Sequence, residues 1–221
     1  ETFTFPKLVA TIGNRMFDGC KSLKEITISE KMTAVMDATQ NIFGNCPVLE
    51  KVNVPEANTS LTSVDGVVYD LAMSTVMYYP QAKNTEGYVM PESIKRISAH
   101  AFRYFVGKNV VLSPNVTQID KYAFAESKIK TITLPKALQK LDTYVFYRCS
   151  DLETVLFEKD CALTSIGQNC FNACIALKSI DLPDNLATMG NNSFTGCTKL
   201  ETVTLPAALK VIPGTCFSQC A

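Results

Sequence analysis

The sequence predicts an α/β solenoid that winds through about nine similar turns. A phrase such as "SFTGCTKLETVTLP" (193–206) recurs along the 221 residues, each copy contains a short run in which apolar and polar residues alternate, and a proline usually follows that run. Alternation with a period of two predicts a strand with one buried face. Because one such unit cannot bury its apolar face alone, we expect consecutive copies to stack into a continuous core.

One aromatic residue marks each copy of the phrase. The markers are Phe17, Phe43, Tyr69, Phe102, Phe124, Phe146, Phe171, Phe194 and Phe217. An aliphatic residue stands five positions before the marker in every copy but the second, where Val35 precedes Phe43 by eight positions. We expect the markers to form one buried column along the solenoid.

Each copy is expected to contribute one strand to a parallel array on one side of the solenoid. The alternating runs include Ile26/Ile28, Val52/Val54, Val110/Leu112, Ile132/Leu134, Val155/Phe157, Ile180/Leu182 and Val203/Leu205. A proline after the run removes a backbone donor and therefore ends the pairing. A second short extended piece should precede each marker, and the segment around the marker should be a brief helical or irregular stretch opposite the strands.

The pattern L-x-x-I-x-L-P, L-x-x-I-G, A-F-x-x-C resembles the BspA-type leucine-rich repeats, a class common on bacterial surfaces and also found in some protists. The resemblance covers residues 1–221 and is best over 119–221. It implies a right-handed leucine-rich-repeat superhelix forming a single domain, 1–221, in a secreted or surface-attached binding protein. The stretch "VDGVVYDLAMSTVMYYP" (64–80) also resembles a β-hairpin insertion often found in such arrays, here at about 65–80.

Charge and hydropathy argue against two classes of partner. Lys plus Arg and Asp plus Glu each number 21, and no stretch concentrates one sign, so neither nucleic acid nor an anionic membrane surface is an expected partner. No apolar run is long enough for a membrane span, and the first ten residues lack the pattern of a signal peptide. The sequence stops just after a repeated motif, as a piece of a longer protein would.

Six of the nine cysteines occupy one equivalent position in the repeat: Cys20, Cys46, Cys149, Cys174, Cys197 and Cys220. Stacked turns would space them about 4.8 Å apart, whereas a disulfide brings its Cβ atoms to about 3.8 Å. We therefore favour buried thiols that donate a weak hydrogen bond to a turn carbonyl over a disulfide framework. Cys170 and Cys216 should be small core residues, and Cys161 the most exposed thiol.

The sequence offers no metal site, cofactor motif or catalytic residue. Cys170–Cys174 and Cys216–Cys220 are C-x-x-x-C pairs, but zinc needs four convergent ligands and His100 is the only histidine. His100 belongs to a column of varied residues, which indicates a surface position without a positioned nucleophile. No glycine-rich phosphate loop is present.

The outward face of the strands is the candidate binding surface. Its positions are mostly polar and rich in threonine, which by itself suits a half-exposed strand. Val89, Val111 and Leu156 add an apolar band around Thr131 and Thr133. Tyr78 and Tyr79 follow in the hairpin region, and two interpretations stay open for them: exposed anchors of an interface, or residues that pack the hairpin onto the solenoid.

These observations predict a non-enzymatic extracellular or cell-surface recognition or adhesion module that binds a protein or glycan, with host or matrix molecules as the expected partners. The first alternative is a passive structural spacer of a larger surface protein. The third hypothesis is a hydrolase, which would require a pocket that gathers titratable side chains near His100 or Cys161.

Overall fold

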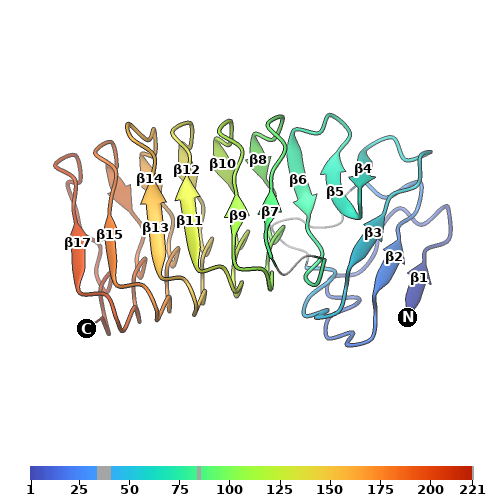
Figure 1. Ribbon diagram of the computed structural model, residues 1–221, viewed down its shortest axis with the longest axis horizontal. Helices are drawn as coiled ribbons and strands as arrows, with labels where there is room; N and C mark the ends of the chain where they lie inside the picture. Colours follow the sequence, from blue (N-terminus) through green and yellow to red (C-terminus); the bar gives the residue numbers. More distant parts are fainter. Residues whose placement is uncertain (34–40, 84–85, 221) are drawn as a thin grey trace.

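The computed structural model describes residues 1–33, 41–83 and 86–220, and the position of Val35 lies outside them. The chain forms an elongated β-solenoid with its two termini at opposite ends (Figure 1). Successive turns place one set of strands on the side facing the viewer and a second set behind it. We call these sets the front strands and the back strands.

The front strands confirm the predicted alternating runs. They are β1 (Thr2–Thr4), β2 (Glu25–Thr27), β3 (Lys51–Asn53), β7 (Tyr88–Val89), β9 (Val110–Val111), β11 (Thr131–Leu134), β13 (Thr154–Phe157), β15 (Ser179–Asp181) and β17 (Thr202–Thr204). All their pairings are parallel. In β11 the side chains of Ile132 and Leu134 are buried while those of Thr131 and Thr133 are exposed, as a period of two requires.

The back strands are the short extended pieces expected before each marker. They are β8 (Arg96–Ile97), β10 (Gln118–Ile119), β12 (Lys140–Leu141), β14 (Ser165–Ile166) and β16 (Thr188–Met189). Each pairs in parallel with the next, in a register that aligns the inward aliphatic residues from Ile97 to Met189. Equivalent positions of successive turns therefore lie directly on one another.

The hairpin insertion continues the back strands rather than the front ones. β4 (Leu61–Val64) pairs antiparallel with β5 (Val67–Asp70), and β5 with β6 (Thr75–Tyr78), while β6 pairs in parallel with β8. The two-residue turn at Asp65 and Gly66 has φ values of 49° and 77°, the left-handed conformation that tight hairpins favour. The insertion thus extends the back sheet to eight strands.

The hairpin separates two hydrophobic cores. Val67, Tyr69 and Val76 pack into a core that continues to the C-terminal end of the solenoid. Val68 and Tyr78 pack on the other side, into a core shared with residues 5–52. Alternate side chains of one strand point to opposite faces, so a hairpin buried on both faces closes both cores at once.

The predicted marker column is present, but Tyr69 is not part of it. Tyr79 stacks on Phe102 with ring centroids 5.1 Å apart, and Tyr78 meets Phe43 at 4.9 Å. The Tyr69 hydroxyl instead lies 2.6 Å from that of Tyr88. Without Tyr69 as a marker, the solenoid has about eight turns, so the expected count of about nine is corrected.

The segments around the markers are turns, and the described residues contain no helix, so the helical part of that prediction is corrected. Around Phe17 and around each marker from Phe102 onward, the residues two before and two after the marker adopt left-handed backbone conformations, as His100 and Tyr104 do with φ of 59° and 61°. Such residues interrupt a right-handed helix. Hydrogen bonds between turns, such as Phe102 N to Ala123 O at 2.7 Å, satisfy the backbone there.

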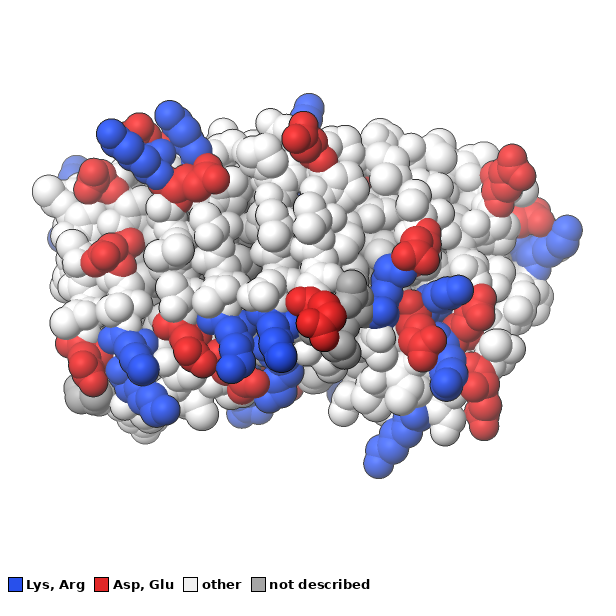
Figure 2. Space-filling view, viewed as in Figure 1, with Lys and Arg blue, Asp and Glu red and all other residues white. Residues whose placement is uncertain are grey.

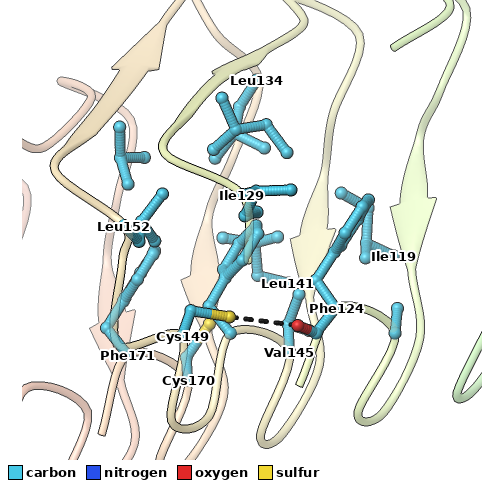
Figure 3. Close-up of a cluster of buried hydrophobic side chains, with 14 of the residues drawn as sticks. Ile119, Phe124, Ile129, Leu134, Leu141, Val145, Cys149, Leu152, Cys170 and Phe171 are labelled. Atoms are coloured by element: carbon cyan, nitrogen blue, oxygen red, sulfur yellow. Dashed lines mark hydrogen bonds between the residues drawn. The ribbon is translucent and has the colours of Figure 1, made fainter. Parts of the chain in front are cut away.

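The repeated cysteines lie inside these corners, and all nine cysteines of the chain are free thiols. The Cys149 Sγ donates to the Phe124 carbonyl of the preceding turn at 3.0 Å (Figure 3). Cys46, Cys174, Cys197 and Cys220 make the same contact at 2.9 to 3.2 Å. The predicted bond to a turn carbonyl is confirmed for these five cysteines, whereas the prediction of full burial is wrong for Cys20 and Cys220, which are partly exposed. Cys161, expected to be the most exposed thiol, is buried against the carbonyls of Pro135 and Leu138.

Candidate binding surface

The predicted apolar band lies on the exposed side of the front strands. Val89 pairs in register with Val111, and Thr133 with Leu156. The bridge between Asn109 and Thr131 sets β9 and β11 in the same register, so Thr133 is the neighbour of Val111 on the next strand. Val89, Val111, Thr133 and Leu156 therefore form one line across four strands, which we call the front row. Its three aliphatic side chains are 73%, 57% and 54% exposed.

A shallow groove runs beside the front row between β9 and β11. These two strands share only the isolated Asn109–Thr131 bridge, whereas β7 pairs with β9 and β11 with β13. The groove has a volume of about 480 Å³ and is lined by Val111, Thr131 and Thr133, with Glu158 at one end. The Thr131 Oγ1 donates to the Asn109 side-chain oxygen at 3.1 Å across it. An interruption of the front sheet thus coincides with the apolar band.

Charged side chains border this face but leave its middle uncharged. Figure 2 shows a white band across the central front strands, with Lys, Arg, Asp and Glu side chains along its lower border. Lys130, which directly precedes β11, lies 3.7 Å from Glu153, which directly precedes β13. Lys108 precedes β9, is exposed, and forms no ion pair within the described part of the chain. Glu158, at the other end of the groove, accepts a hydrogen bond from the Lys136 amide at 2.8 Å.

Tyr78 and Tyr79 do not belong to this surface. Both side chains are buried, and each ring contacts the aromatic column of a different core. Burial also raises the pKa of Tyr79 to about 12. The interpretation of these residues as exposed anchors of an interface is therefore wrong. The other interpretation, in which they pack the hairpin onto the solenoid, is the one that the structure supports. Of the predicted residues, Val89, Val111, Thr131, Thr133 and Leu156 remain on the surface.

His100 lies at a second, smaller hollow, so its expected surface position is corrected as well. The residue is 5% exposed, and its ring stacks on that of Tyr122 with the centroids 5.1 Å apart. The hollow has a volume of about 260 Å³ and also contains Arg15, Asp18 and Arg103. Hydrogen bonding to Arg15 lowers the pKa of Asp18, which makes this carboxylate a weak base. No serine, threonine or cysteine is among the lining residues that the structure describes.

Among residues 1–33, 41–83 and 86–220, no group of three or more His, Cys, Asp or Glu side chains is arranged to hold a metal ion. Across the same residues, no helix is both long and apolar enough to cross a membrane.

The chain matches a known family along almost all of its length. A family model described as a BspA-type leucine-rich repeat region matches in six copies, over residues 1–65, 76–162 and 159–221. The interval between the first two matches falls on the hairpin, where the repeat is interrupted. No curated protein matches the chain significantly.

Solved structures share the fold. A leucine-rich repeat protein from Eubacterium ventriosum superposes with a TM-score of 0.82 at 24% identity, over 99% of this chain and 64% of that one. The pneumococcal vaccine antigen PcpA gives a TM-score of 0.66 at 23% identity, over 99% of this chain and 54% of that one. The chain therefore spans less than two thirds of the length of these similar proteins.

Proposed function

Because the chain belongs to the BspA-type leucine-rich repeat family, we propose that it is a non-enzymatic recognition or adhesion module of the cell surface or extracellular space. In this proposal it binds a protein or glycan through the front strands. The observation that carries the proposal is the front row, in which three exposed aliphatic side chains align on an otherwise polar face.

Physical arguments support a binding role for this face. Exposed apolar side chains are ordinary when scattered, but a continuous patch with a polar rim marks interaction sites. A solenoid also presents its side chains on an extended surface that suits recognition of large partners. A passive spacer would need no such alignment, since any polar residue is compatible with the outward positions of a strand.

The non-enzymatic part of the proposal rests on the family, whose matched model is a repeat region. The His100 hollow is the place where the hydrolase hypothesis could apply, because it gathers titratable side chains. Its carboxylate, Asp18, is held in a hydrogen bond by Arg15. Nucleophilic catalysis most often uses a serine, threonine or cysteine beside a general base, and none of these residue types is among the described lining residues.

The test is a binding screen of the chain against immobilised host matrix proteins and a glycan array. We expect at least one ligand to be retained, and its affinity to fall about tenfold or more in the double variant Val111→Lys/Leu156→Lys, because the apolar contact would be lost. Val64→Lys and Leu71→Lys are matched controls, since these hairpin side chains are 54% and 58% exposed, like the 57% and 54% of Val111 and Leu156. Circular dichroism checks that every variant is folded.

The outcome also separates the alternatives. Ligands that bind the double variant and the native chain equally would place the binding site elsewhere and contradict the proposal. A chain that retains no ligand would favour the passive spacer.

A further inference from the structure

We infer that the front row recognises an extended polypeptide segment that carries aliphatic side chains and a carboxylate, rather than a glycan. This inference rests on the proposed function and specifies the chemistry of its partner. Three observations support it: the kind of apolar groups exposed, the length of the row, and an unpaired lysine beside it.

The exposed apolar groups are aliphatic, not aromatic. Sugar rings pack their C–H faces against the flat faces of aromatic side chains, which supply rigid contact area. Within the described ranges, none of the large exposed hydrophobic side chains is aromatic. Tyr88, the aromatic residue in β7, is half-buried, and its hydroxyl is held 2.6 Å from that of Tyr69. Val89, Val111 and Leu156 instead suit other aliphatic side chains.

The front row matches the repeat of an extended peptide. It crosses three strand intervals of about 4.8 Å, which gives a length of about 14 Å. A peptide in extended conformation presents every second side chain on one side, about 6.8 Å apart. Three side chains of such a segment would span the row, and the groove between β9 and β11 offers the central one a recess beside Val111 and Thr133.

Lys108 supplies charge complementarity at one border of the row. Its carbonyl accepts the Lys130 amide at 2.9 Å, so the two lysines follow one another along the lower edge. Lys130 forms an ion pair with Glu153, whereas Lys108 has no acidic partner among the residues described. A carboxylate of a bound segment would therefore find its opposite charge at Lys108. Such a rim contact contributes mainly to the association rate and to salt dependence.

The experiment selects peptides from a displayed random library on the immobilised chain, with an oligosaccharide array probed in parallel. We expect enriched peptides to combine aliphatic residues with Asp or Glu, and a synthetic peptide of the enriched sequence to bind about tenfold or more weakly to Leu156→Lys. Lys108→Glu should weaken binding about threefold or more at low salt, and replacing the peptide carboxylate by lysine should restore it.

Two substitutions serve as matched controls. Leu71→Lys makes the same change at a leucine with similar exposure on the hairpin, and Lys95→Glu makes the same charge change at an exposed lysine just before β8. Neither should change peptide binding by more than about twofold.

The remaining outcomes distinguish this inference from the proposed function. No enriched peptide, enriched peptides without acidic residues, or full binding to Lys108→Glu would overturn the inference. Oligosaccharides captured by the native chain and lost in Leu156→Lys would overturn it too, while the proposed function would stand. If peptides or sugars bind but ignore Val111→Lys and Leu156→Lys, both proposals fail.

Discussion

The two sides of the hairpin build the same repeat with different regularity. On the C-terminal side, the rings from Phe102 to Phe217 stack 5.0 to 5.4 Å apart with interplanar angles of 7° to 15°. On the N-terminal side, Phe17 and Phe43 are 6.1 Å apart at 21°. Phe3 and Phe5 cover Phe17 with their edges instead of extending the stack.

Turn length also differs between the two regions. Successive markers are 22 to 25 residues apart from Phe102 onward, but 26 apart between Phe17 and Phe43. The shorter turns leave few residues outside the stacked positions, so equivalent side chains superpose closely. The buried cysteines are also divided between the two cores. Cys46 belongs to the N-terminal core, and the C-terminal core contains Cys149, Cys170, Cys174 and Cys197. A regular turn length thus favours a regular interior.

Alkaline pH should produce the largest difference between the two cores. Burial raises the pKa of Cys149 and of Cys197 to about 12 and that of Cys46 to about 11, from an ordinary value of 9.0. Above pH 9 the unfolded chain loses these protons while the folded chain keeps them, so the free energy of unfolding falls as pH rises. Each thiol contributes up to about 1.4 kcal/mol per pH unit.

Denaturant titrations between pH 9 and 11 measure this slope. We expect Cys149→Ala/Cys197→Ala to reduce its magnitude by up to about 2.7 kcal/mol per pH unit, and Cys46→Ala by up to about 1.4. Val145→Ala is a control, since it opens a buried site without removing a titratable group. If the cysteine substitutions leave the slope of the unfolding free energy against pH unchanged, the buried thiols are not its cause.

Removal of one marker ring should have the next largest effect. Phe194 stacks on both Phe171 and Phe217, so Phe194→Ala should lower the free energy of unfolding by about 3 to 5 kcal/mol. Phe17→Ala should cost about 1 kcal/mol less, because Phe17 has one stacked neighbour, at a longer distance. Chemical denaturation measures both, with Leu8→Ala as an exposed control. A loss below about 1 kcal/mol for Phe194→Ala would show that a stacked marker is dispensable.

Much of this architecture could be predicted from the sequence, because the repeat determines both its strands and its stacking. The sequence predicts Tyr69 as a marker because it stands five residues after an aliphatic, Val64, as most of the true markers do. The distinction depends on the hairpin, which turns Tyr69 toward one core and brings Tyr79 into the column. The helical segments predicted around the markers are absent from the described residues for another reason. His100, Tyr122 and Tyr144 adopt left-handed conformations that are usual for glycine.

The candidate binding surface is only partly predictable from the sequence. Period-two alternation identified Val89, Val111 and Leu156 as outward residues, and the structure places them there. The groove between β9 and β11 is not predicted from the sequence, because an even repeat predicts evenly paired strands. A signal was present in that turn, where Phe105 and Gly107 replace the usual cysteine and leucine just before β9. Departures from a repeat are therefore the places to search for recognition sites.

The smallest expected effect compares one glycine position in the two regions. Gly190 and Gly13 both follow the second aliphatic residue of their turns. A Cβ at Gly190 would lie 2.3 Å from the Gln168 amide nitrogen of the preceding turn, whereas a Cβ at Gly13 would meet nothing within 4 Å. Gly190→Ala should therefore cost about 1 to 3 kcal/mol through overpacking, and Gly13→Ala less than about 0.5 kcal/mol. Equal losses of the two variants in chemical denaturation would contradict close stacking of turns as the reason for the glycine at position 190.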